Sequence, residues 1–197
     1  MRYIYFLIFV VFFTACSVKT PPLEKYTLNP KLTIPKTKNN TCKDKSIKII
    51  QPFSSNIYVI NEIKYVVNNL EENSYNNSSW SISISDTFYF NILKALRKSE
   101  VFKNVENYAT VSVSDYILEV EISDFKQYFS KDLKKSYIVA DVTFNLVDKK
   151  SLKTISQKRF YKKIPSKTND VKGGVEALNK ALDDILKEMI VWIEGRC

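Results

Sequence analysis

The fold is decided by the stretch Tyr116-Ile-Leu-Glu-Val-Glu-Ile-Ser-Asp-Phe-Lys-Gln-Tyr-Phe129, in which apolar and polar residues alternate. In an extended chain Leu118, Val120 and Ile122 lie on one face, and the glutamates between them lie on the other. Such alternation is typical of an antiparallel strand with one face buried and one face in water. We therefore expect a long, half-buried strand here.

Two further stretches continue this pattern towards the C-terminus. Apolar and polar residues alternate from Ser136 to Val147, and Asp148-Lys-Lys-Ser151 predicts a turn into a third strand near 153–164. The three strands together predict a meander. Shorter apolar runs at Ser46–Gln51 and Glu62–Val67 predict two more strands that precede it.

Two segments have the three- and four-residue spacing of an amphipathic helix. The first runs from about Ser83 to Ser99, with Ser85-Asp86 as its expected N-cap. The second covers about 173–194, opens at the pair Gly173-Gly174 and has an apolar stripe. This stripe is assigned to core packing, because carboxylates lie opposite it, where interfacial membrane helices usually carry Lys and Arg. The expected fold class is α+β, a mixed or antiparallel sheet covered by two helices.

The segment from Asn68 to Ser79 is polar and rich in turn-forming residues, so we expect a loop that leads to Trp80. Tyr75 and Trp80 are candidates for a partner-binding surface, because exposed aromatic residues are common anchors of protein interfaces. The alternative is that Trp80 is buried in the core, which burial tendencies favour.

The N-terminus has the layout of a bacterial secretory signal, with Arg2, an apolar run over 3–13 and a small residue before Cys16. The end of it, Phe13-Thr-Ala-Cys16, resembles a lipobox, which implies cleavage before Cys16 and lipidation of its sulfur. An uncleaved span would need roughly 20 apolar residues, more than this run offers. Cleavage by an ordinary signal peptidase would need a small residue in place of Phe13.

The sequence thus divides into three parts. Residues 1–15 are the expected signal peptide, 16–44 a lipidated N-terminus with a Pro-, Lys- and Asn-rich tether, and 45–197 the folded domain. Within the tether, Tyr26-Thr-Leu28 is a β-prone triplet that could dock on the sheet.

With Cys16 lipidated, two cysteines remain, Cys42 and Cys197, and they flank the predicted domain. We expect a disulfide between them, since an oxidising compartment outside the cytoplasm permits it. The alternative is two unpaired thiols. No metal site is expected, because the chain has no histidine and zinc requires about four Cys, His or carboxylate ligands.

The composition excludes several kinds of chemistry. Three glycines cannot build a phosphate-binding or dinucleotide-binding loop, and without histidine the common Ser-His and Cys-His pairs are excluded. We therefore expect no enzyme activity and no cofactor. The net charge of +9 favours an anionic neighbour such as lipid headgroups, although scattered lysines are usually a solvated face. Nucleic acid is not expected as a partner outside the cytoplasm.

Several pieces of the chain, in this order and spacing, resemble the ABC-type transport auxiliary lipoproteins. They are Lys25–Leu28, Ser46–Gln51, Glu62–Tyr65, Tyr75–Trp80, Leu93–Leu96, Val101–Val105, Tyr116–Phe125, Ala140–Val147 and Ala177–Trp192. The resemblance implies a non-catalytic periplasmic α/β domain, lipid-anchored in the outer membrane. It also implies a lipid-transport machine as partner, with an ABC permease, its ATPase and a substrate-binding protein of the mammalian-cell-entry (MCE) type. The Asn77-Ser-Ser-Trp80 step departs from the Asn-Ser-Arg-Trp type usual in the family.

The leading hypothesis is a lipoprotein that docks this machinery to the outer membrane. The alternative is a pilotin-like lipoprotein that assembles an outer-membrane secretin or barrel, and a carrier that itself binds lipid is a third reading. Ser17 replaces the Asp that retains lipoproteins in the inner membrane of well-studied bacteria, so outward sorting is expected. Whether the protein forms a homo-oligomer is left open.

Overall fold

A computed structural model describes residues 22–34, 41–54 and 61–197 of the chain. In these ranges nine strands form one sheet, accompanied by two helices. In chain order the elements are β1 (Glu24–Tyr26), β2 (Ser46–Ile49), β3 (Phe53–Ser54), β4 (Glu62–Val67), β5 (Glu71–Trp80), α2 (Ile84–Ser99), β6 (Asn104–Glu106), β7 (Tyr116–Phe129), β8 (Ser136–Asp148), β9 (Lys153–Pro165) and α3 (Val171–Ile193).

The strand β7 organises the sheet. On one edge it pairs antiparallel with β8, which pairs antiparallel with β9, so the predicted meander is confirmed. On its other edge β7 pairs in parallel with β2, β3 and β4 in turn. The hairpin of β4 and β5 extends the sheet, β1 adds to β5 in parallel, and β6 adds to β2. The sheet is therefore mixed, and the α+β class is confirmed.

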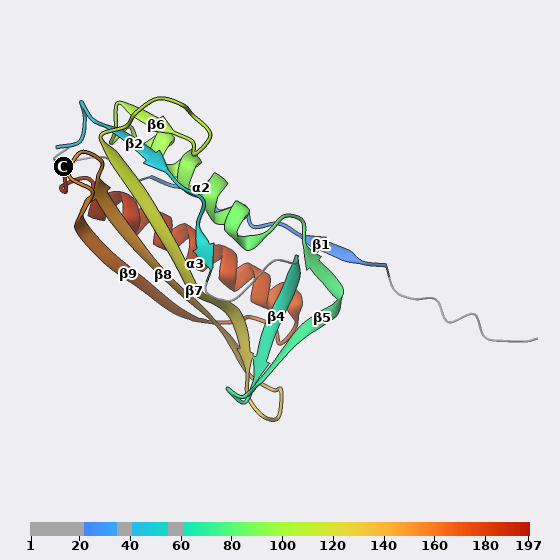
Figure 1. Ribbon diagram of the computed structural model, residues 1–197. Helices are drawn as coiled ribbons and strands as arrows, with labels where there is room; N and C mark the ends of the chain where they lie inside the picture. The colour runs from blue at the N-terminus through green and yellow to red at the C-terminus, as the bar shows by residue number, and fades with distance from the viewer. Residues whose placement is uncertain (1–21, 35–40, 55–60) are drawn as a thin grey trace, which may run out of the picture.

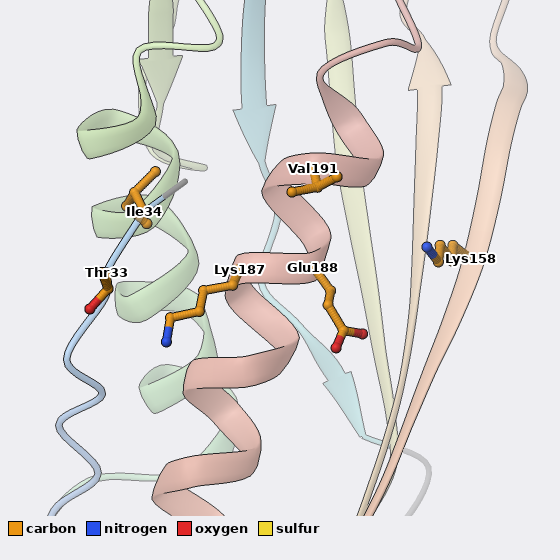
Figure 2. Close-up of a pocket in the computed structure, with 6 residues that line it drawn as sticks. All are labelled: Thr33, Ile34, Lys158, Lys187, Glu188 and Val191. Carbon is orange, nitrogen blue, oxygen red and sulfur yellow. The ribbon is translucent and has the colours of Figure 1, made fainter. Parts of the chain in front are cut away.

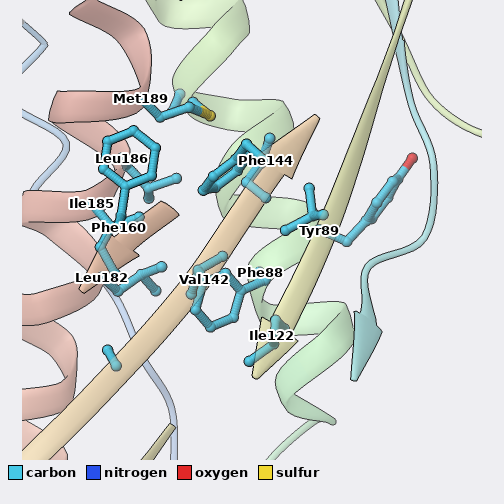
Figure 3. Packing of buried hydrophobic residues seen from close by; sticks show 14 of the residues in the cluster. Phe88, Tyr89, Ile122, Val142, Phe144, Phe160, Leu182, Ile185, Leu186 and Met189 are labelled. Atoms are coloured by element: carbon cyan, nitrogen blue, oxygen red, sulfur yellow. The ribbon is translucent and has the colours of Figure 1, made fainter. Parts of the chain in front are cut away.

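Both helices cover the same face of the sheet (Figure 1), where the apolar side of the alternating strands lies. Figure 3 shows this core, with side chains of both helices meeting those of β7, β8 and β9. Its fully buried members include Ile122, Val142 and Phe144 from the strands, Phe88 from α2 and Leu182 from α3. Burying a side chain of this size stabilises the fold by roughly 1.5–3 kcal/mol.

The helix ends differ in detail from the prediction. α2 is capped by Ser83, whose hydroxyl accepts a hydrogen bond from the Asp86 amide at 3.0 Å, and not by the Ser85-Asp86 pair. α3 begins two residues before the glycine pair, because Asp170 caps it by accepting from the Gly173 amide at 2.8 Å. Cap residues satisfy amides that have no partner inside the helix.

The polar segment before Trp80 is a strand, β5, and the expectation of a loop is wrong there. The turn is confined to the start of the segment, where Asn68 and Asn69 have positive φ of 51° and 57°. Asparagine adopts this left-handed conformation more readily than most residues. The Asn- and Ser-rich remainder extends because β4 and β1 pair with it on both edges.

Residues 22–34 of the expected tether pack on the domain. Leu28 and Leu32 belong to the hydrophobic core, and β1 pairs with β5. The Leu32 amide donates to Asp183 Oδ1 of α3 at 2.8 Å, and Lys98 Nζ of α2 donates to the Leu32 carbonyl at 2.9 Å. Residues 22–34 therefore pack as part of the folded domain, although the sequence assigned them to the tether.

Across the described ranges, neither helix combines the length and the apolar character required to cross a membrane.

Candidate functional site

Cys16, the expected lipidation site, lies outside the described residues. The other two cysteines are joined: Cys42 and Cys197 form the expected disulfide, with their Cα atoms 5.1 Å apart. Beside it, the Thr41 amide donates to the Glu194 carbonyl at 3.3 Å, and the Thr41 hydroxyl donates to the same oxygen at 3.1 Å. The chain before β2 is thus attached to the C-terminal end of α3.

Trp80 does not form a partner surface. Its side chain is 4% exposed and belongs to the core, so the surface interpretation is wrong and the buried alternative is confirmed. The burial follows from its position, because it ends β5 just before α2, and the backbone of Tyr26 in β1 pairs with it on the open edge.

Tyr75 is half-buried and belongs to a chain of hydrogen-bonded polar side chains on the helix-covered face of the sheet. Its hydroxyl donates to Gln127 Oε1 at 2.9 Å, and Gln127 Nε2 donates to the Ser136 hydroxyl at 3.0 Å. The Ser136 hydroxyl donates to Asn169 Oδ1 at 3.0 Å. Burial raises the pKa of Tyr75, which keeps its hydroxyl protonated as a donor.

This polar chain requires close approach by α3. A Cβ atom on Gly174 would lie 2.0 Å from Gln127 Oε1, so only glycine fits there without moving the glutamine. Sequence reasoning missed Gln127, although a signal exists: it is in phase with Phe125 and Phe129, which are both buried. A lone amide at a buried strand position needs hydrogen-bond partners.

On the helix-free face, β7 and β8 place two carboxylates opposite each other. Asp124 pairs in register with Asp141, whose carboxylate accepts two hydrogen bonds from Arg159, one of them from Nε at 2.6 Å. Asp124 accepts from the Tyr128 hydroxyl and lies 3.9 Å from Lys126 Nζ. Because both carboxylates have partners, the arrangement is typical of a structural ion-pair network.

The sequence pattern misplaces Asp124. Strict alternation would put it on the core side with Ile122, but a bulge shifts the register between these two residues. Asp124, Lys126 and Tyr128 therefore face away from the helices, and Phe125, Gln127 and Phe129 face them. Burial still raises the pKa of Asp124.

An open groove of about 590 Å³ lies over α3, with residues 33–34 on one side of the helix and β9 on the other (Figure 2). Two of its ionic groups are already paired, Lys187 with Asp183 at 2.6 Å and Glu188 with Lys162 at 2.5 Å. The groove therefore offers apolar walls and no free carboxylate. It is lined by Thr33, Ile34, Lys158, Lys187, Glu188 and Val191.

A second hollow, of about 630 Å³, lies between the β7–β8 turn and the loop from β9 to α3, and we call it the basic hollow. Four lysines line it, and within the described ranges none of them has a salt bridge. Asn169 Nδ2 donates to the Lys134 carbonyl at 2.5 Å and joins the two segments. Its lining residues are Lys134, Lys135, Ser136, Tyr137, Lys163, Pro165, Ser166, Lys167 and Asn169.

In the part of the chain that the structure describes, no three Cys, His, Asp or Glu side chains gather as a metal site would require. The surface of the described residues therefore has three features that could serve a function: an ion-pair network, an apolar groove and a basic hollow.

Solved structures share the fold. A protein from Xanthomonas campestris of the family DUF330 has a TM-score of 0.77 at 16% identity, covering 86% of this chain and 94% of that one. A hypothetical protein from Chlamydia trachomatis has a TM-score of 0.56 at 12% identity, covering 78% and 97%. At these identities the likeness shows the fold alone. No family model matches the chain, and no curated protein matches it.

Proposed function

We propose that the protein is an exported, lipid-anchored and non-catalytic lipoprotein that acts as the auxiliary component of an ABC-type intermembrane lipid-transport system. In this role Cys16 carries the lipid, and the domain docks an MCE-type substrate-binding protein, with its permease and ATPase, to the outer membrane. The domain supplies binding surfaces, and the transport machinery supplies the chemistry.

The observation that carries the proposal is the order of the sequence pieces that resemble the auxiliary lipoproteins. Each piece coincides with, or overlaps, an element of one fold: the series starts at β1, continues through β2, β4, β5, α2 and β6, and ends with β7, β8 and α3. Isolated short matches would fall on unrelated parts of a structure. If the chain shares a domain with the auxiliary lipoproteins, the similar pieces should be the strands of one sheet and the helices that cover it.

The disulfide supports the exported part of the proposal. Disulfides persist in the periplasm and are rare in the cytoplasm. Cys42 and Cys197 are bonded, which leaves Cys16 as the third cysteine, placed at the end of the signal where a lipobox requires it.

The partner assignment is tested by purification from native membranes. The lipidated protein, tagged at its C-terminus, should recover the permease, the ATPase and an MCE-domain protein, identified by mass spectrometry. Recovery of an outer-membrane secretin instead would favour the pilotin-like alternative. Recovery of none of these proteins would contradict both roles.

The anchor is tested separately by membrane fractionation. Cys16→Ala should leave the domain folded but release it from the outer-membrane fraction. The control is Leu23→Ala, an exposed position outside the signal and outside the disulfide, which should stay in the membrane fraction. A membrane-bound Cys16→Ala variant would overturn the lipoprotein assignment.

A further inference from the structure

Two turns at one end of the sheet carry exposed leucines. Leu70 lies in the β4–β5 turn and is 82% exposed, and Leu133 lies in the β7–β8 turn and is 53% exposed. The turns are neighbours, since the Asn68 amide donates to the Phe129 carbonyl at 3.0 Å and the Tyr137 hydroxyl donates to Asn69 Oδ1 at 3.3 Å. Figure 1 shows both at the same tip of the molecule.

The basic hollow adjoins these leucine turns, because Lys134 follows Leu133 directly. Lys134, Lys135, Lys163 and Lys167 are exposed on its rim. Four lysines around a hollow can bind the phosphate groups of lipid headgroups. Leucines beside them can insert into the acyl region just below those headgroups.

The nearby carboxylates offset the lysines of the basic hollow only in part: with Lys131 of the same turn, five lysines stand against three carboxylates, those of Glu71, Asp132 and Asp170. Asp170 accepts from the Gly173 amide and the Thr168 hydroxyl, and Asp132 accepts from the Ser130 hydroxyl at 2.6 Å. Glu72 is paired with Lys64 and Lys126. Local charge therefore favours an anionic surface.

The number of residues between Cys16 and β1 indicates that this anionic surface is the membrane that holds the Cys16 lipid. β1 runs parallel to the last three residues of β5, with Glu24 opposite Ser78. Leu70 is eight residues before Ser78, and Cys16 is eight residues before Glu24. Eight extended residues span at most about 28 Å, and eight strand residues about 26 Å, so a lipid on Cys16 can lie level with the leucine turns.

We propose that this end of the sheet, with Leu70, Leu133 and the basic hollow, contacts the anionic phospholipid surface of the membrane that holds the Cys16 lipid. Leu70 and Leu133 enter the interface, and the lysines bind phosphate headgroups. The inference rests on the lipid anchor of the proposed function and not on the transport role. It fixes which end of the domain faces the membrane.

The test uses the lipidated protein in vesicles with one thiol-reactive, polarity-sensitive fluorophore. Leu133→Cys provides the attachment point, because Cys42 and Cys197 are bonded to each other. The matched control is Leu152→Cys: Leu152 is 71% exposed in the β8–β9 turn, and its φ of 56° matches the 58° of Leu133. Vesicles contain phosphatidylcholine alone or mixed with phosphatidylglycerol, and brominated lipids serve as quenchers.

We expect brominated lipid to quench the fluorophore at position 133 at least about threefold more strongly than at position 152, and only in the anionic vesicles. Replacing the four lysines of the basic hollow by Gln should remove this difference while the protein still floats with the vesicles. Equal quenching at both positions in floating protein would overturn the inference, and a partner other than lipid would then have to cover this end. Failure to float would instead contradict the lipid anchor.

Discussion

At the scale of single residues, the sharpest constraint is on Gly173 in the first turn of α3. A Cβ atom there would lie 2.2 Å from the Thr168 carbonyl and 2.8 Å from its amide nitrogen, and backbone atoms cannot rotate away as a side chain can. We expect Gly173→Ala to lower the free energy of unfolding by about 1–3 kcal/mol, despite the better helix propensity of alanine. Urea unfolding followed by circular dichroism measures it.

The matched control for this variant is Gly195→Ala. No atom lies within 4 Å of the Cβ position on Gly195, so its stability should match that of the wild type. If Gly173→Ala were as stable as Gly195→Ala, the close contact between the Thr168 backbone and α3 would be wrong.

Asp124 predicts a dependence of stability on pH. Burial raises its pKa, so the folded chain holds a proton on Asp124 more tightly than the unfolded chain does. Its contribution to stability is therefore complete below the unfolded pKa of about 3.9 and is lost as pH rises through the folded pKa. Asp124→Asn should stabilise the protein at neutral pH by about 1 kcal/mol, since one oxygen of the buried carboxylate has no hydrogen-bond partner.

The measurement is chemical denaturation at neutral and acidic pH, and the advantage of Asp124→Asn should disappear at acidic pH. Asp132→Asn is a control of opposite sign. A hydrogen bond from Ser130 holds the pKa of Asp132 below its usual range, so its contribution is present above the unfolded pKa and lost as pH falls. A constant difference between Asp124→Asn and wild type at all pH values would argue against the raised pKa.

At the scale of elements, two variants can decide whether residues 22–34 are a free tether or a docked part of the domain. Leu32 is 1% exposed against α2 and α3, so Leu32→Ala should cost about 2–4 kcal/mol through lost burial and the cavity left behind. Leu23 in the same segment is 57% exposed, and Leu23→Ala should change stability little. Thermal unfolding of the two variants would show equal melting temperatures if the whole segment were a free tether.

The elements that the sequence predicted best are those whose burial repeats over many residues. β7, β8, α2 and α3 each carry a long apolar pattern, and the predicted ends lie within a few residues of the observed ones; β9, which is mostly exposed, is predicted from the turn before it. β5 was missed because its exposed positions are Asn, Ser and Glu, which local preference assigns to turns. Its extension is imposed by pairing with β1 and β4, which no local window contains.

The candidate sites were predictable to a smaller extent. Pairing of Cys42 with Cys197 followed from counting cysteines, since two remain once Cys16 is assigned to lipid. The basic hollow could not be recognised, because Lys134 and Lys135 meet Lys163 and Lys167 only when the β7–β8 turn and the β9–α3 loop lie at one end of the sheet. The bulge before Asp124 does leave a mark, because the apolar residues change from even positions up to Ile122 to odd positions at Phe125 and Phe129.

At the scale of the whole molecule, the central strand joins segments that are far apart in sequence, as β2 and β4 both pair with β7. Long-range pairing of this kind makes the entropy of the unfolded chain important for stability. The disulfide acts on that entropy, because it closes a loop with a sequence separation of 155 and, among the elements that the structure describes, encloses all except β1.

Removing the disulfide should therefore destabilise the whole domain rather than one end of it. The chain-entropy relation gives up to about 5 kcal/mol for this loop, and the double variant Cys42→Ser, Cys197→Ser should lose about 3–5 kcal/mol. Treating wild type with reductant should produce the same loss in urea unfolding, whereas reductant should leave the double variant unchanged. Full stability of the reduced wild type would mean that Thr41 and the packing of α3 close the loop without the covalent bond.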